Sequence, residues 1–181
     1  MRKKFLIVLF LLIAIISVYF LDLNDRLNNN GNGISHMAFI DNEYRLGDEN
    51  KDKEHPKGLY KRNFLNEDYK FPRTEVENIK IYKNLPFVSR LTGKSLSESQ
   101  RIELQKFFNS PENFDWAETT WTLRESDYIL RFFDQDEAEI GKVWLCLNNC
   151  GMTFTNPFSP NMKFGSLNNA GIKKIESILK L

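Results

Sequence analysis

The hydrophobic pattern divides the chain into three segments. Residues Phe5 to Leu21 read FLIVLFLLIAIISVYFL and contain no charge, glycine or proline. This run predicts a helix that is apolar on every side and about 25 Å long, near the lower limit for crossing a bilayer. Residues 22–56 are polar, rich in Asn, Gly and mixed charges, and predict a flexible tether. Residues 57–181 carry the periodic patterns of a folded domain.

Two amphipathic helices are predicted in this domain. Ser97 and Gln100 have the spacing of a capping box, so a helix begins there and ends before the Ser-Pro step at 110–111. The C-terminal sequence SLNNAGIKKIESILKL places its isoleucines on one stripe and its lysines off it. That spacing predicts a second amphipathic helix, which closes the domain.

The strands are predicted between these helices. VENIKIYKNL and WAETTWTL have strand-like composition, and DYILRFF and EIGKVWLCL flank the acidic connector DQDEAE as a hairpin. Alternation places Val143 and Leu145 on one face and Lys142, Trp144 and Cys146 on the other. Large apolar groups therefore occur on both faces, so we expect one face on the core and the other partly covered. The sequence predicts an α+β domain, a small antiparallel sheet with helices packed on one face.

The apolar N-terminal run predicts membrane attachment and the topology of the chain. Its exit, SVYFLDLND, lacks the small residues of a signal-peptidase site, which favours a retained anchor over a cleaved secretory signal. Arg2, Lys3 and Lys4 precede the run and predict a cytoplasmic N-terminus. We therefore expect a single-pass membrane protein that contacts the lipid bilayer through Phe5–Leu21, with its C-terminal domain outside the cytoplasm.

Composition narrows the choice of partners. The chain of 181 residues has a net charge of +1, and without the first three basic residues 22 basic face 24 acidic residues. No basic stripe remains to pair with phosphates, so nucleic-acid binding is disfavoured. The 15 phenylalanines predict an aromatic-rich core.

The two cysteines, Cys146 and Cys150, lie in the sequence LCLNNCG. A structural zinc site usually needs four ligands, and both histidines, His36 and His55, lie in the predicted tether. Redox catalysis normally uses two intervening residues at a helix N-terminus, whereas this spacing is three and Cys146 ends a strand. A disulfide, allowed by an oxidising compartment, and two buried thiols both remain open.

The acidic residues carry no recognisable catalytic or metal motif. The connector around Asp134 and Asp136 fails the spacing of a calcium-binding loop and reads as a solvated hairpin tip. Glu118, Glu125 and Asp127 border strands, where carboxylates are mostly surface residues. The sequence predicts no cofactor and no catalytic residue.

A partner-binding loop is the one candidate site with a physical basis. The segment MTFTNPFSPNMKFG reads as a loop or an edge strand, in which two prolines restrict the backbone and large apolar side chains offer anchors. The candidate anchors are Phe154, Phe158, Met162 and Phe164. The alternative interpretation is ordinary core packing.

The residues Ser95–Leu181 loosely resemble small exported or membrane-attached bacterial proteins of unassigned function. The resemblance lies in SLSESQRIELQKFFNSPENFDWAET, FFDQDEAEIGKVWLCL and FGSLNNAGIKKIESIL. It implies a place in the cell envelope and no activity. We expect a membrane-anchored extracytoplasmic module of a bacterial envelope that binds a protein partner. The alternative is an envelope enzyme, a hydrolase or a thiol-dependent enzyme, with an unrecognised site.

Overall fold

The structure is a computed structural model of the whole chain, and it describes residues 6–17, 69–85, 89–115, 126–148, 150–157, 159–163 and 165–181. Residues 6–17 form a helix, which lies within the predicted apolar run. Among the described residues, no helix is long and apolar enough to cross a membrane. The predicted tether, residues 22–56, lies outside the described residues, as does the predicted strand WAETTWTL.

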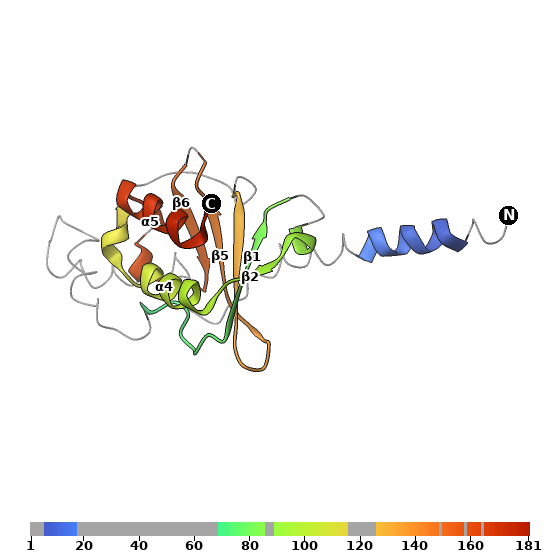
Figure 1. Cartoon of the computed structure of the whole chain (residues 1–181), viewed down its shortest axis with the longest axis horizontal. Helices are drawn as coiled ribbons and strands as arrows, with labels where there is room; N and C mark the ends of the chain where they lie inside the picture. The colour runs from blue at the N-terminus through green and yellow to red at the C-terminus, as the bar shows by residue number, and fades with distance from the viewer. Residues whose placement is uncertain are drawn as a thin grey trace, which may run out of the picture.

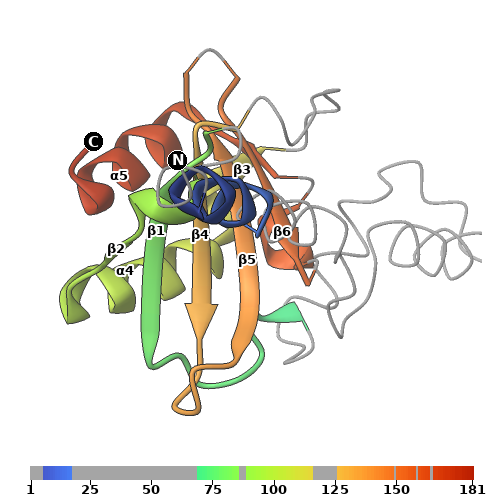
Figure 2. The ribbon, with the colours of Figure 1, turned by 90° about the vertical axis from the view of Figure 1, so that its right-hand side faces the viewer.

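The described part of the domain is α+β, as the sequence predicts, and is built on an antiparallel sheet of seven strands in the order β2-β1-β4-β5-β6-β7-β3 (Figure 1). The strands are β1 (Asn78–Lys83), β2 (Lys94–Ser95), β3 (Phe114–Asp115), β4 (Tyr128–Phe133), β5 (Glu139–Cys146), β6 (Met152–Asn156) and β7 (Ser166–Leu167). The predicted hairpin is confirmed as β4–β5, and β6 continues it as a meander. Figure 2 shows β1, β4 and β5 side by side.

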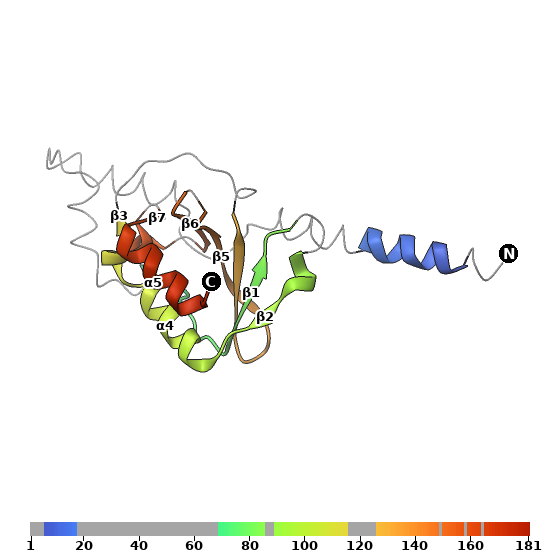
Figure 3. The same ribbon diagram turned by 45° about the horizontal axis from the view of Figure 1, so that its top comes forward.

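Two α-helices and three short 3-10 helices complete the described part of the domain. The α-helices are α4 (Glu98–Phe108) and α5 (Asn169–Leu179), and the 3-10 helices are η2 (Ser89–Thr92), η3 (Pro111–Asn113) and η5 (Pro160–Met162). Figure 3 shows α4 and α5 together on one side of the sheet, and contacts join the two helices. The prediction of helices on one face is thus confirmed.

Both helices begin where side-chain capping predicts. Ser97 Oγ accepts a hydrogen bond from the Gln100 amide at 3.3 Å, and the Gln100 side chain accepts one from the Ser97 amide at 3.0 Å. This is the predicted capping box, which satisfies backbone donors that the first turn leaves unpaired. Asn168 caps α5 through a 2.8 Å bond from the Gly171 amide. The missing side chain at Gly171 lets α5 approach the Asn113 carbonyl, which a Cβ would meet at 2.3 Å.

Phenylalanines form the centre of the core, as their number predicts. The Phe71 ring packs edge-on against Phe132 and Phe108, with ring centroids 5.0 and 6.1 Å apart. Phe107 joins Phe108 to Phe114, so the aromatic cluster connects α4 to both the central strands and the sheet edge. Edge-to-face pairs of this kind stabilise a core beyond the area that they bury.

The helix-facing side of the sheet is apolar across its central strands. Ile81 of β1, Leu130 of β4 and Val143 of β5 occupy one row of paired positions, and Leu130 and Val143 are fully buried. Leu104, which is fully buried, packs into the same core from α4. The buried stripe of α4 therefore fixes the helix on this face.

Substituting Leu104 should show how much this packing stabilises the domain. We expect Leu104→Ala to lower the free energy of unfolding by about 2–5 kcal/mol, because it removes buried methyl groups and leaves a cavity. Ile102→Ala is the matched control on the same helix, since Ile102 is 42% exposed, and it should cost under about 1 kcal/mol. Urea unfolding of both variants measures the difference, and equal losses would contradict the assigned burial.

Candidate functional site

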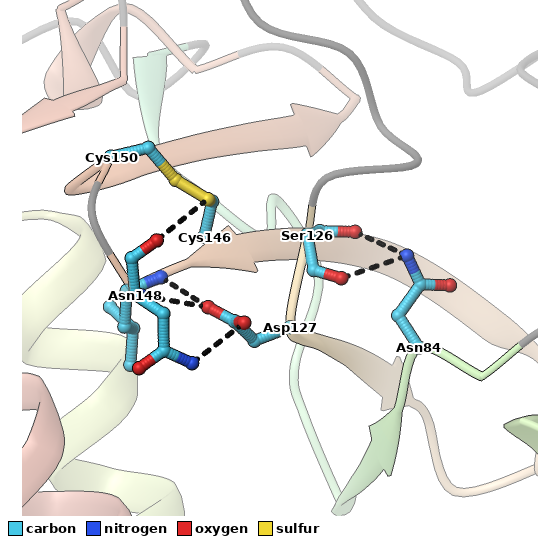
Figure 4. Close-up of a disulfide and its surroundings, with 7 residues drawn as sticks. Asn84, Ser126, Asp127, Cys146, Asn148 and Cys150 are labelled. Carbon is cyan, nitrogen blue, oxygen red and sulfur yellow. Dashed lines mark hydrogen bonds between the residues drawn. A yellow bond between two sulfur atoms is a disulfide. The ribbon is translucent and has the colours of Figure 1, made fainter.

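The two cysteines are joined in a disulfide at the end of β5 (Figure 4). Cys146 is the last residue of β5 and is buried, and Cys150 lies two residues before the start of β6 at Met152. Their Cα atoms are 5.7 Å apart, within the usual range for a disulfide, whereas a straight strand would separate them by about 13 Å. The β5–β6 connection therefore folds back on itself, and Gly151, with φ of 56°, supports that turn.

Asp127 holds the same connection from the start of β4. Its Oδ2 accepts hydrogen bonds from the amides of Leu147 and Asn148 at 2.7 and 2.9 Å. Its Oδ1 accepts a third bond from the Asn148 side chain at 2.8 Å (Figure 4). Bonds to an ionised carboxylate are among the stronger hydrogen bonds in proteins. The sequence identified Asp127 only as a carboxylate bordering a strand, and the structure gives it a role in positioning the disulfide loop.

Asn84 ties the end of β1 to this region. Its side chain donates to the Ser126 carbonyl and hydroxyl at 3.0 and 2.7 Å, and its amide donates to the Asp127 carbonyl at 2.9 Å. Three segments distant in sequence, the end of β1, the start of β4 and the β5–β6 turn, are thus joined by side-chain hydrogen bonds at one end of the sheet. This joined region is called the disulfide end below.

The face of the sheet opposite the helices carries cations and aromatic rings. Lys80, Arg131 and Lys142 occupy paired positions on β1, β4 and β5, and Arg131 and Lys142 are 7% and 4% exposed. Arg131 lies over the ring of Tyr82 and Lys142 over the ring of Trp144, at 5.4 and 5.3 Å. Cation–π contacts of this kind favour a charged group that has lost water. We expect this second face of the hairpin to be partly covered, and its central residues Arg131, Lys142 and Trp144 are buried.

Glu139 supplies the countercharge on this face. Its Oε2 lies 2.7 Å from Arg131 Nη1, and its Oε1 lies 3.2 Å from Lys142 Nζ. A register shift between Phe132 and Phe133 pairs Glu139 with Phe133, and Ile140 packs toward the core. The β-bulge therefore turns the carboxylate onto the cationic face and its neighbouring isoleucine onto the apolar face.

The acidic hairpin tip lies at the other end of the sheet. Asp134 Oδ1 accepts hydrogen bonds from the amides of Asp136 and Ala138, both at 2.9 Å, so this carboxylate stabilises its own turn. A shallow pocket of about 340 Å³ lies beside the tip and includes Lys80, Phe133 and Glu137 in its lining. No group of three or more metal-ligating side chains occurs in the part of the chain that the structure describes.

The structure describes two of the four predicted anchors of the partner-binding loop, Phe154 and Met162. Phe154 lies on β6, is 36% exposed and packs against Trp144 with ring centroids 5.7 Å apart. Met162 is 2% exposed and belongs to the hydrophobic core, so it is not available as an anchor. Phe158 and Phe164 lie outside the described residues. The alternation of the β6 residues around Phe154 was the available signal for a strand in place of a loop.

The remaining candidate residues fall outside the structure's described ranges. They are Glu118, Glu125, His36 and His55. The structure instead brings together Arg131, Lys142 and Glu139, which the sequence did not single out as a group. The sequence did contain a signal for this group: a basic residue interrupts each of the apolar stretches YILRFF and GKVWLC, where an unpaired buried charge would be costly.

Comparison with protein-family models, with curated proteins and with solved structures gave no match. The class of the molecule therefore rests on its fold and its residues. They define an α+β domain with a disulfide at one end of the sheet and a cationic, aromatic second face.

Removing the Asp127 carboxylate should loosen the disulfide loop. We expect Asp127→Ala to lower the free energy of unfolding by about 1–3 kcal/mol, because two backbone amides lose their acceptor. The disulfide should also be reduced faster by dithiothreitol, as thiol trapping over time would record. Asp136→Ala is the control, since Asp136 is exposed at the other end of the sheet and should change neither quantity. An unchanged reduction rate in Asp127→Ala would contradict the proposed positioning role.

Neutralising Glu139 should destabilise the second face. We expect Glu139→Gln to cost about 1–3 kcal/mol, less than for a fully buried pair because the Glu139 side chain is 32% exposed. Adding Lys142→Met should recover part of the loss, since one buried cation is then removed. A double-mutant cycle by urea unfolding measures the coupling. Glu103→Gln, at an exposed position of α4, is the control, and zero coupling between positions 139 and 142 would contradict the pairing.

Proposed function

We propose that the chain is a membrane-tethered binding module, anchored by its N-terminal helix and presenting the α+β domain outside the cytoplasm. The observation that carries this proposal is the helix over residues 6–17. Every residue of the helix is exposed, and its large apolar side chains are 43–72% exposed around the whole circumference. A helix that is apolar on all sides normally lies in a protein core or in lipid.

The flanking sequence supports anchoring in a bilayer. The apolar run continues to Leu21 in the sequence, and Arg2, Lys3 and Lys4 precede it. Basic residues beside an apolar segment favour a cytoplasmic location of the N-terminus, so we expect the domain that follows to lie outside the cytoplasm. The Cys146–Cys150 disulfide suits this topology, because extracytoplasmic compartments permit oxidation.

The domain supports binding better than catalysis. The two carboxylates at the disulfide end and on the second face, Asp127 and Glu139, are engaged in hydrogen bonds that hold loops and buried cations. The two cysteines are joined to each other. These groups stabilise the fold, and a protein partner remains the proposed ligand of the envelope module.

Charges placed in the N-terminal helix should release the chain from the membrane. We expect the full chain to resist alkaline carbonate extraction and to keep Met1, as N-terminal mass analysis would show. The double variant Leu11→Arg with Leu12→Arg should be extracted, because each central arginine costs about 2.5–3.5 kcal/mol in the apolar phase. Leu11→Phe with Leu12→Phe is the matched control and should stay bound. Extraction of the unaltered chain, or a new N-terminus near residue 22, would contradict the anchor.

The binding proposal is tested by crosslinking in native membranes. The full chain should capture one protein in stoichiometric amount when it is crosslinked in place and purified. Turnover of a small molecule by the purified chain, with no captured protein, would favour an envelope enzyme instead.

A further inference from the structure

The connection between β1 and β2 presents two exposed leucines. Leu91 in η2 is 75% exposed, and Leu85, which follows β1, is 41% exposed. Apart from the N-terminal helix, Leu91 is the most exposed large apolar side chain among the residues that the structure describes. Leu85 and Leu91, with the flanking Lys83 and Lys94, are called the apolar tip below.

The backbone that carries the apolar tip is held in place by hydrogen bonds. The Lys83 amide donates to Thr92 Oγ1 at 2.9 Å, and Thr92 Oγ1 in turn donates to the Ser89 carbonyl at 2.6 Å. The Leu85 amide bonds the Lys83 carbonyl at 2.9 Å, one residue from the Asn84 side chain that reaches Ser126. Because these hydrogen bonds restrain the backbone beside both leucines, contact through the leucines would cost less ordering of that backbone.

A packing contact between Tyr82 and Gly93 also restrains the connection that carries the tip. The Tyr82 ring lies against Gly93, where a Cβ would meet the ring at 2.5 Å. Among the described residues of this connection, the exposed large apolar side chains are therefore the two leucines, whereas Tyr82 packs against the backbone. The hydrogen bonds and the Tyr82–Gly93 contact therefore hold both leucines at this end of the sheet.

The charges differ between the two ends of the sheet. Lys83 and Lys94 are exposed beside the apolar tip. Lys83 pairs with Tyr128 at the start of β4, whereas the acidic hairpin follows Phe133 at the other end of that strand. The tip and the acidic residues Asp134, Asp136 and Glu137 thus lie at opposite ends of β4. Asp127 lies at the end with the tip, but its carboxylate accepts three hydrogen bonds from Leu147 and Asn148. The exposed lysines at one end and the acidic turn at the other favour one orientation at a negatively charged surface, with the apolar tip toward it.

We propose that the apolar tip is a second membrane contact, in which Leu85 and Leu91 enter the interface and Lys83 and Lys94 pair with anionic lipid headgroups. The inference rests on the proposed membrane attachment through residues 6–17. An apolar surface with basic residues at its border has the chemistry of a peripheral lipid contact.

The size of the apolar tip favours lipid over a protein partner. A stable protein interface usually buries about 800 Å² on each side, and the described residues of the tip supply two leucines and two lysines toward that area. A contact that follows anchoring needs less intrinsic affinity, because the tether keeps the domain at a high effective concentration near the bilayer. The tip therefore fits a secondary contact of an already attached domain.

The test compares the full chain in vesicles of two compositions, one of phosphatidylcholine alone and one with a third of phosphatidylglycerol. Flotation reports the anchor, and backbone hydrogen exchange around Leu85 and Leu91 reports the tip. We expect flotation with both vesicles, and slower exchange at the tip only with phosphatidylglycerol. Each lysine near the anionic surface should change the strength of contact roughly fivefold, so both together act strongly.

Two double variants and one matched control separate lipid contact from folding effects. Leu85→Ser with Leu91→Ser, and separately Lys83→Glu with Lys94→Glu, should float normally and lose the protection. Ile102→Ser with Lys106→Glu, at exposed positions of α4, should retain it. Circular dichroism confirms that each variant is folded, and a variant that is not folded is replaced by its single leucine or single lysine form.

The outcomes distinguish the two proposals. Flotation without any change in exchange around Leu85 and Leu91 would overturn the membrane contact of the tip and leave the anchor intact. Failure of the unaltered chain to float would overturn both. Protection that grows with protein concentration in detergent, without vesicles, would assign the tip to contact with protein and overturn the lipid contact.

Discussion

The structure depends on a sheet that is buried at its centre on both faces. One face is ordinary, with leucines, valines and phenylalanines under two helices. The other buries Arg131 and Lys142, whose transfer from water is unfavourable unless charge and hydrogen-bonding partners replace the solvent. Glu139 and the rings of Tyr82 and Trp144 supply part of that replacement. The central hairpin is thus stable only if these groups meet in one register.

The β-bulge makes the two faces compatible with one strand. Strict alternation would place Glu139 with Val143 on the apolar face, where an ionised carboxylate has no solvent. The extra residue moves Glu139 to the cationic face and lets Ile140 pack toward the core. Any slip of the β4–β5 register by one residue would exchange the faces, burying lysine against phenylalanine. The bulge and the ion pairs therefore specify the same pairing.

Local signals explain which features the sequence predicts. The capping box at Ser97, the stripe of α5 and the hairpin depend on neighbours within a few residues, and each is confirmed. The bulge, the hydrogen bonds from the β5–β6 connection to Asp127 and the burial of Met162 depend on segments far apart in the chain. Met162 illustrates the difficulty, because a methionine that follows two prolines suits an exposed loop and a core equally well until η5 is placed. For the cysteines, the sequence narrowed the alternatives to a disulfide or buried thiols.

The meander also determines what each end of the sheet can do. Successive antiparallel strands return to the same two ends, so connections that alternate along the chain gather together in space. The end with the disulfide collects the β1–β2 and β5–β6 connections, which Asn84 and Asp127 tie to the start of β4. The opposite end collects the acidic β4–β5 turn, which is closed by its own side chain. The two ends of the sheet therefore differ in chemistry: one has a disulfide and side-chain hydrogen bonds between segments, and the other has an exposed acidic turn.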